Sequence, residues 1–453
     1  EPIFNDYIRR LYYVLYDRPE FDPLIALSFL VIGLITISIV DRFFKRRIPD
    51  IADNKLYPVL MVYFIYMVIR VAVLNDTSIK NGILIPPGGL MWNTFVLMFF
   101  AGAVVLEKKE TLIKISFISV ILGFLAAAWG IKQFHIGYMQ GEQMWLDYLK
   151  AEGKFTTLFI AGVPRPFSTL KSPACFADFM LISIFSTLFL FTIKRVKIIW
   201  LLGILPMCYS ILITSVRSNW FGFGAGLAFW FVFLRFKSPR GRLFAFIFIC
   251  LVAVITNFTV DYFMERNQKL KQFSIVRLQQ NTGNQEQKDL ADIMIRSRAT
   301  ALHDPLGEYS MQHRLKLWGL VLRESVTRFQ GILGFGMGTF DAHSYYFSIL
   351  RCIGYPGLLL FLWLLYRTLK VGLQRFDSSE EFDDINIFRY LLTIIVLICV
   401  INLTGVHLSY HPADIYFWFF LGALVNCQWN REFLEQGSGG GSLGNDLLAD
   451  QQS

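Results

Sequence analysis

Arginines at the edges of apolar runs are the side chains best suited to chemistry in this sequence. Arg217 lies in ITSVRSNWFGFG, where one apolar run ends and the next begins, and Arg351 lies inside a later run. A charge in or near a lipid bilayer is costly, so each arginine is a functional hypothesis. A planar guanidinium can bind phosphate through two parallel hydrogen bonds. Arg217 is therefore an anion ligand or a snorkelling interfacial residue, and Arg351 an anion ligand or a member of a structural ion pair.

Three more basic residues lie in polar segments between apolar runs. Arg165 and Lys171 belong to VPRPFSTLKSP, in which two prolines and Ser/Thr residues predict a fixed turn. Arg314 belongs to HRLKLWGLVLRES, which has the apolar periodicity of an amphipathic helix. Each of the three is either a substrate-binding charge or an ordinary residue of a turn or a solvated helix.

A histidine follows the glycine-rich segment GILGFGMGTF at position 343. Imidazole exchanges a proton near pH 7, so His343 is a candidate general base, the alternative being a structural histidine at the start of a helix. His407 and His411 could share one helix face, but no carboxylate motif accompanies them and Pro412 interrupts, so we expect no metal site. The glycine segment lacks the lysine of a P-loop, and we expect no nucleotide or other cofactor.

The elements that must position these residues are transmembrane helices. Hydrophobic residues make up 55% of the 453 residues and charged residues only 17%, whereas a soluble domain carries about a quarter charged residues. Apolar runs near the roughly 20 residues that cross a bilayer recur along the chain. We predict an all-α polytopic membrane protein with about eleven transmembrane helices, or about twelve if a further helix lies upstream. The net charge of +9 collects in short loops and does not indicate nucleic-acid binding.

The predicted spans are 24–40, 56–74, 90–106, 112–131, 174–193, 198–216, 218–234, 243–260, 344–366, 386–404 and 412–427. A short apolar segment, 7–16, is predicted to be an interfacial helix. Alternate short loops are rich in Lys and Arg, which the positive-inside rule assigns to the cytoplasm. One of these loops holds Arg367, Lys370 and Arg375. The N-terminus is then outside and the C-terminus inside.

Two long segments, 132–173 and 261–343, are consequently predicted on the outer side. The second is partly helical, with predicted helices at 285–303 and 308–328. The chain thus divides into N-terminal transmembrane helices at 1–260, the large outer loop at 261–343, C-terminal transmembrane helices at 344–435, and a glycine-serine linker with a polar tail at 436–453.

In their order and spacing, these motifs resemble those of the O-antigen ligase and Wzy-type polysaccharide polymerase superfamily. RPFSTLKSP, which begins at Arg165, resembles the family's outer Arg-x-x-Gly/Ser-Thr-Phe-x-x-Pro turn, and VRSNW, with Arg217, its Ser-Arg-Gly/Ser-x-Trp turn. Arg314 and Trp318 match an Arg-x-x-x-Trp helix. GFGMGTF, His343 and IGYPGLLLF resemble the Gly-x-Gly-x-x-x-Phe, His-Asn and Leu-Gly-x-x-Gly-Leu motifs that follow.

The resemblance covers about residues 165 to 362, with four departures from the family pattern. Val216 replaces the usual Ser before the arginine, Ser344 the usual Asn after the histidine, Ala174 a common Asn and Cys352 a common Glu. These departures affect acceptor contacts and leave the arginines and the histidine in place.

The resemblance implies a glycosyltransferase of the bacterial inner membrane whose active site faces the periplasm. Its donor would be an undecaprenyl-diphosphate-linked oligosaccharide and its acceptor a glycan or lipid-linked hydroxyl, with a chain-length regulator as a candidate partner. The resemblance assigns catalytic roles to His343, Arg217 and Arg314 and substrate binding to Arg165, with Lys171 and Arg351 as further binding candidates. It implies inversion at the anomeric carbon without metal.

Several activities fit this resemblance. We favour a polymerase of O-antigen or exopolysaccharide repeat units. The alternatives within the class are a ligase that transfers glycan to lipid A core and a pilin-modifying oligosaccharyltransferase. The rival from another class is a flippase of lipid-linked oligosaccharide, which should carry charges along a path at mid-membrane. Asp178 and Arg351 are the candidates for such charges.

Overall fold

The computed structural model describes residues 56–72, 97–105, 109–151, 159–160, 163–232, 247, 309–336, 342–379, 381–409 and 412–425. Several predicted elements lie outside these residues. They are the interfacial helix at 7–16, the span at 24–40, the span at 243–260 apart from residue 247, the helix at 285–303 and the tail at 436–453.

The described chain is helical except for a short antiparallel pair formed by β1 (Phe159–Ile160) and β2 (Val163–Pro164). The helices are α3 (Leu56–Ala72), α6 (Leu97–Val105), α7 (Lys109–His135), α8 (Gln140–Ala151), α9 (Pro173–Thr192), η2 (Ile198–Gly203), α10 (Ile204–Thr214), α11 (Arg217–Phe231), α15 (Tyr309–Thr327), α16 (Phe329–Leu333), α17 (Tyr345–Ser378), α18 (Phe382–Ile401), η4 (His407–Ser409) and α19 (Ala413–Val425).

A helix lies at every predicted span that falls within the described residues. Four of these helices, α7, α9, α17 and α18, are long and apolar enough to cross a membrane. The prediction of a helical membrane protein is therefore confirmed in its coarse form. The number of about eleven spans and the assignment of the two sides stay predictions.

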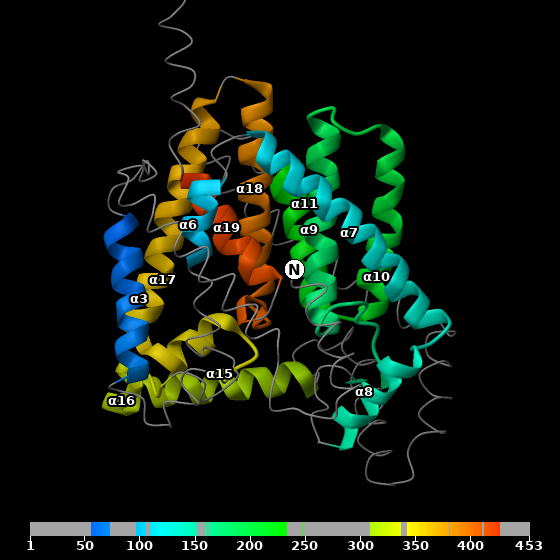
Figure 1. The fold of residues 1–453 in the computed structure, drawn as a ribbon. Coiled ribbons are helices and arrows are strands. Elements are labelled where there is room, and N and C mark those ends of the chain that lie inside the picture. The colour runs from blue at the N-terminus through cyan, green and yellow to red at the C-terminus, as the bar shows by residue number, and fades with distance from the viewer. Residues whose placement is uncertain are drawn as a thin grey trace, which may run out of the picture.

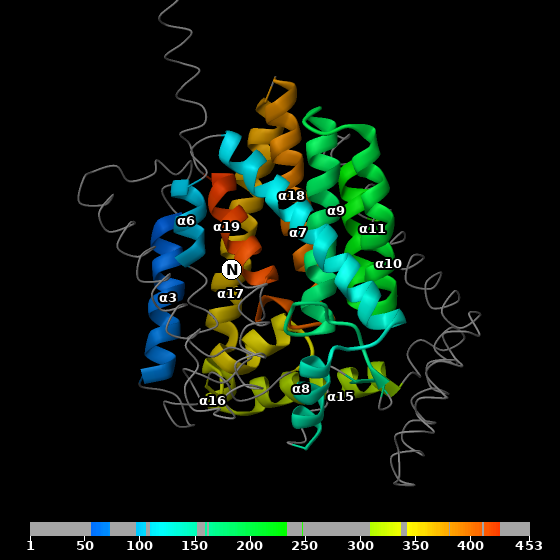
Figure 2. The ribbon, with the colours of Figure 1, turned by 45° about the vertical axis from the view of Figure 1, so that its right-hand side comes forward.

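The helices form a bundle in which α9 is buried on almost every side. α9 contacts α7, α10, α11 and α18, and Phe189 of α9 stacks on Tyr390 of α18 with ring centroids 4.6 Å apart. Figures 1 and 2 show α3, α6, α17 and α19 on one side of the bundle, α9, α10 and α11 on the other, and α18 between them.

The contact between α6 and α19 depends on two glycines. A Cβ atom at Gly102 would lie 1.8 Å from the carbonyl oxygen of Phe419, and one at Gly422 would lie 1.8 Å from that of Phe99. Small residues at helix interfaces let two backbones approach closely, which is how apolar helices associate where lipid removes the hydrophobic driving force.

α17 is longer than the predicted span 344–366. Arg367, Lys370 and Arg375 lie on this helix, so their prediction as loop residues is wrong. The helix continues because buried residues recur three and four positions apart beyond the apolar run. These residues are Thr368, Val371, Gly372, Arg375 and Phe376.

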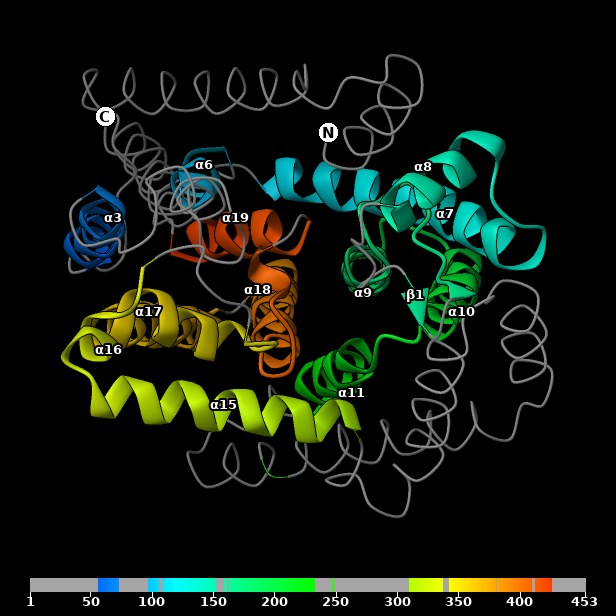
Figure 3. The same ribbon diagram turned by 90° about the horizontal axis from the view of Figure 1, so that it is seen from below.

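Each of the two predicted outer segments contains a helix, of which one was predicted and the other was not. α15 occupies the predicted 308–328, and this prediction is confirmed. α8 lies within 132–173, where no helix was predicted. Figure 3 shows α15 lying across one end of the bundle, from α16 and α17 towards α11. We call this the α15 end.

The opposite end holds the turns between α9 and η2 and between α17 and α18 (Figure 1). There, Lys109 forms ion pairs with Glu381 at 3.2 Å and Asp384 at 2.5 Å. The basic residues Lys194, Arg195 and Lys197 occupy the turn after α9. The α15 end with the sequence motifs thus lies opposite the end that holds these turns.

A candidate active site at the α15 end

The turn that carries Arg165 is fixed by buried hydrogen bonds. Ser168 adopts a left-handed conformation, with φ 54°, which is uncommon for a residue other than glycine. Its N–H donates to Gln133 Oε1 at 2.7 Å and its hydroxyl donates to the carbonyl of Ala126 at 2.7 Å. The predicted turn is therefore present, and α7 holds it in place through Gln133, which lies outside the sequence motif.

Gln133 is in turn oriented by Glu142 of α8. Its Nε2 donates to Glu142 Oε1 at 2.7 Å, and Trp129 Nε1 donates to the same oxygen at 3.0 Å. Glu142 is buried, and a buried carboxylate requires such partners. The unpredicted helix α8 thus has a physical role, which is to support the Arg165 turn.

Arg165 reaches from this turn to the end of α10. Its Nε donates to the carbonyl of Thr214 at 2.7 Å. Thr214 is the last residue of α10, and the final carbonyls of a helix have no partner within it. Arg165 therefore caps α10 three residues before Arg217.

The connection between α10 and α11 places Arg217 at a helix start. It consists of Ser215, with φ 54°, and Val216, and α11 begins at Arg217. The sequence prediction that two helices meet at this arginine is confirmed. Lys171, half-buried, lies in the Arg165 turn just before Ser172, whose hydroxyl caps α9 by accepting from Cys175 N at 3.2 Å.

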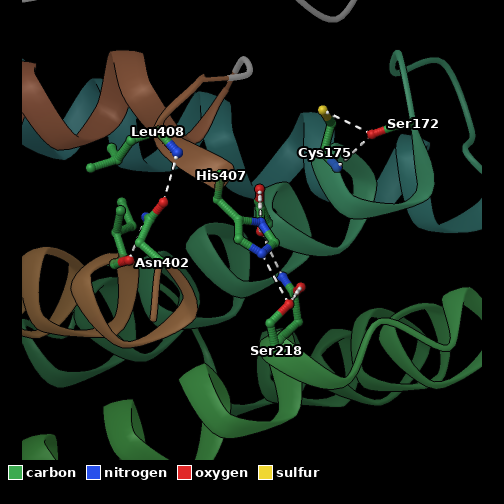
Figure 4. Close-up of polar contacts among 9 residues, drawn as sticks. Ser172, Cys175, Ser218, Asn402, His407 and Leu408 are labelled. Carbon is green, nitrogen blue, oxygen red and sulfur yellow. Dashed lines mark hydrogen bonds and ion pairs between the residues drawn. The ribbon is translucent and has the colours of Figure 1, made fainter. Parts of the chain in front are cut away.

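A buried polar cluster lies directly behind Arg217. His407 Nδ1 contacts the Asp178 carboxylate at 2.9 Å, and His407 Nε2 contacts the Ser218 hydroxyl at 2.9 Å. Asn219 Nδ2 donates to Asp178 at 2.7 Å. Figure 4 shows the His407 imidazole facing Ser218. Asp178, His407, Ser218 and Asn219 are at most 8% exposed, and we call them the His407 cluster.

The loop that carries His407 also contacts the segment that carries His343. The N–H of Tyr345 donates to the carbonyls of Asn402 at 3.1 Å and Gly405 at 2.9 Å. Asn402 Oδ1 accepts from Leu408 N at 3.0 Å, which orders the loop (Figure 4). His343, two residues before Tyr345, therefore lies at the same end of the bundle as Arg217.

His343 is exposed at the start of α17 and is held by α15. It has a left-handed φ of 52°. The carbonyl of the preceding residue, Ala342, accepts from Trp318 Nε1 at 2.9 Å, and the Trp318 ring stacks on Phe347 with centroids 5.1 Å apart. The His313 ring lies 6.0 Å from the His343 ring.

Arg314 is half-buried on α15 and lies one residue after His313 and four residues before Trp318 in sequence. Residues four apart on a helix share a face, so Arg314 lies on the face from which Trp318 contacts α17. The Arg-x-x-x-Trp spacing thus places Arg314 on the same face of α15 as Trp318, which holds the backbone next to His343.

Arg351 has a different environment from the other arginines. It forms an ion pair with Glu324 of α15, and its guanidinium lies 4.4 Å from the Phe335 ring centroid. Its carbonyl accepts from Phe335 N at 2.8 Å. Among the two readings of Arg351, these contacts favour a member of a structural ion pair.

The glycine segment after α16 packs on a kink in α17 at Gly354. Gly334 and Gly354 have φ values of 88° and 71°. A Cβ at Gly334 would lie 2.5 Å from Gly354 N, and one at Gly354 would lie 2.2 Å from the carbonyl oxygen of Ile332. Arg70 of α3 donates to the carbonyl of Gly334. Within the described part of this segment, the glycines serve backbone packing.

The structure thus brings Arg165, Arg217, Arg314 and His343 to the α15 end and pairs Arg351 with Glu324. His407 belongs to the cluster with Asp178, while His411 lies outside the described residues. No group of three metal-ligating side chains occurs among the residues that the structure describes.

Sequence reasoning missed the partners Gln133, Glu142, Ser218 and Asn219. A lone carboxylate at Asp178 in an apolar run and a histidine at 407 were the available signals, because a buried charge requires a partner. No protein-family model matches this chain, and no curated protein matches it either.

Proposed function

We propose that this protein is a membrane glycosyltransferase that moves an oligosaccharide from a polyprenyl diphosphate carrier to a glycan hydroxyl. The observation that carries the proposal is the arrangement of three motif arginines and an exposed histidine at one end of an apolar helix bundle. Arg165 caps the helix before Arg217, and Trp318, four residues after Arg314, holds the residue before His343.

The arginines supply what a diphosphate leaving group needs. Arg217 and Arg314 bind the phosphates and stabilise the negative charge that grows as the sugar–phosphate bond breaks. Arg165 supports this pair by capping α10, and Lys171 of the same turn adds positive charge. Guanidinium suits this task because it is planar and remains protonated.

His343 takes the proton from the acceptor. The acceptor hydroxyl oxygen attacks the anomeric carbon, its proton moves to the imidazole, and the carbon–oxygen bond to the diphosphate breaks with its electron pair leaving on the phosphate. Because nucleophile and leaving group occupy opposite faces of the sugar, the anomeric configuration inverts. The reaction requires neither a metal ion nor a nucleotide.

The carrier lipid and the location follow from the same proposal. The carrier is undecaprenyl diphosphate, the membrane is the bacterial inner membrane, and the α15 end faces the periplasm. We favour polymerisation of O-antigen or exopolysaccharide repeat units, with transfer to lipid A core as the alternative acceptor reaction.

The flippase is the second candidate, and two charges inside the bundle, Asp178 and Arg351, bear on it. Asp178 is bonded to His407 and Asn219, and Arg351 is paired with Glu324. A flippase would use paired charges of this kind along a translocation path through the membrane.

The two functions are separated by one assay on the purified protein in liposomes. Labelled lipid-linked oligosaccharide, an acceptor glycan and EDTA are supplied, and both glycan length and label accessibility across the bilayer are followed. The proposal predicts longer or transferred glycan and released polyprenyl diphosphate. Label that crosses the bilayer chemically unchanged, with no transfer to acceptors, would establish the flippase instead.

A further inference from the structure

The His407 cluster has no part in the chemistry proposed so far, although two of its members directly follow Arg217 in sequence. It joins three elements that are far apart in sequence, namely α9 through Asp178, α11 through Ser218 and Asn219, and η4 through His407. Burying a carboxylate and an imidazole is costly unless they are paired, so the cluster requires each member.

The tautomer of His407 sets the donor and acceptor roles in the cluster. With the Nδ1–H of His407 donated to Asp178, the Nε2 lone pair faces the Ser218 hydroxyl as an acceptor. The Ser218 oxygen lies 2.9 Å from this nitrogen and 3.3 Å from Asn219 Oδ1, so the contact with His407 is the shorter of the two that its single proton can make. The carboxylate thus selects the imidazole tautomer that can hold Ser218. Asn219 Nδ2 occupies a second acceptor position on Asp178 at 2.7 Å, so both of the residues that follow Arg217 are tied to one carboxylate.

Ser218 connects this network to Arg217, because it is the next residue in α11. Arg217 is the first residue of α11, and Val216 before it makes no side-chain capping hydrogen bond. Ser218 and Asn219 supply side-chain bonds that hold the first turn of α11. Because Arg217 begins this turn, the cluster contributes to the direction in which its side chain leaves the helix.

We propose that His407, oriented by Asp178, is a positioning residue that aims Arg217 at the diphosphate by holding Ser218. This inference rests on the proposed function for the identity of the anion. Serine, histidine and aspartate in this order also form nucleophilic triads, but the Ser218 hydroxyl is buried against the imidazole and Asn219, which suits a structural link.

The test compares Ser218→Ala and His407→Asn with a matched control. Asn keeps an amide near Nδ1 for Asp178 and removes the contact with Ser218. Ser186→Ala is the control, because Ser186 is a buried serine of α9 bonded to Tyr390 at 2.7 Å and belongs to the bundle interior. We expect Ser218→Ala and His407→Asn to lower kcat for glycan transfer by about five- to tenfold, with KM for the donor little changed. Ser186→Ala should leave both kcat and KM unchanged.

A double-mutant cycle separates action through Arg217 from a general loss of structure. In an Arg217→Ala background, Ser218→Ala should produce no further loss of kcat, because the residue that it positions is absent. An equal loss of kcat in both backgrounds would overturn the positioning role.

A chemical readout makes the inference testable without activity. The rate at which phenylglyoxal modifies Arg217 is followed by peptide mass spectrometry, with exposed Arg323 as internal reference. This rate should change several-fold in Ser218→Ala and His407→Asn and stay constant in Ser186→Ala. Unchanged modification in all three variants overturns the positioning role, whether or not transfer is observed. Wild-type protein that transfers no glycan would overturn the proposed function, and the modification rates would still decide the role of His407.

Discussion

Arginines with the same chemistry have different environments in this protein. Arg165 donates to the carbonyl of the last residue of α10, and Arg217 is the first residue of α11. Arg351 instead joins α17 to α15 through Glu324 and packs against Phe335. The residue type alone does not separate binding from structural roles, and for Arg351 the ion pair with Glu324 favours a structural role.

The ion pair of Arg351 gives a prediction about stability. Arg351→Gln leaves the partly buried Glu324 without its cation, so the free energy of unfolding should fall by about 1–2 kcal/mol. Adding Glu324→Gln should recover part of this loss. Denaturant titration in micelles measures both variants, and glycan transfer per folded molecule should equal that of the wild type. Lost transfer at wild-type stability would instead make Arg351 a substrate ligand.

At the scale of elements, α15 connects Arg314, a proposed anion ligand, to the helix that carries His343. Trp318 makes two separate contacts with this region, a hydrogen bond to the carbonyl of Ala342 and a stack on Phe347. Val321, one turn further along α15, adds a buried apolar contact with Ala342 and Leu350. The hydrogen bond sets the backbone next to His343, while the apolar contacts hold the two helices together.

This division of roles predicts different outcomes for two substitutions on α15. Trp318→Phe retains an aromatic ring for Phe347 and loses the N–H to Ala342, so transfer should fall by about fivefold with little loss of stability. Val321→Ala removes buried methyl groups and should lower the free energy of unfolding by about 1 kcal/mol with transfer per folded molecule unchanged. Full activity in Trp318→Phe would show that His343 does not depend on this bond.

At the scale of the whole molecule, the coarse architecture, a bundle of apolar helices, could be predicted from the sequence. Apolar runs located the described spans and periodicity located α15, because both are local properties of the chain, whereas α8 was not predicted. Helix ends were less predictable, since α17 continues to Ser378 on buried residues spaced along a polar segment.

The candidate site was predictable only in part, because some of its residues are brought together by helices that are distant in sequence. The arginines and His343 are visible as motifs, but Asp178 and His407 are 229 residues apart in sequence. A pair that forms by packing of distant helices leaves no local spacing to detect. Gln133 was missed similarly, because its partner in the Arg165 turn belongs to another element.

The central claim is that His343 activates an acceptor at the α15 end. The most direct test is the single-turnover rate of glycan transfer for wild type, His343→Ala and His135→Ala, the last replacing an exposed histidine bonded to Tyr209. We predict a loss of about a hundredfold or more for His343→Ala, typical of a removed general base, and a wild-type rate for His135→Ala. A wild-type rate in His343→Ala would contradict the account and make this histidine structural.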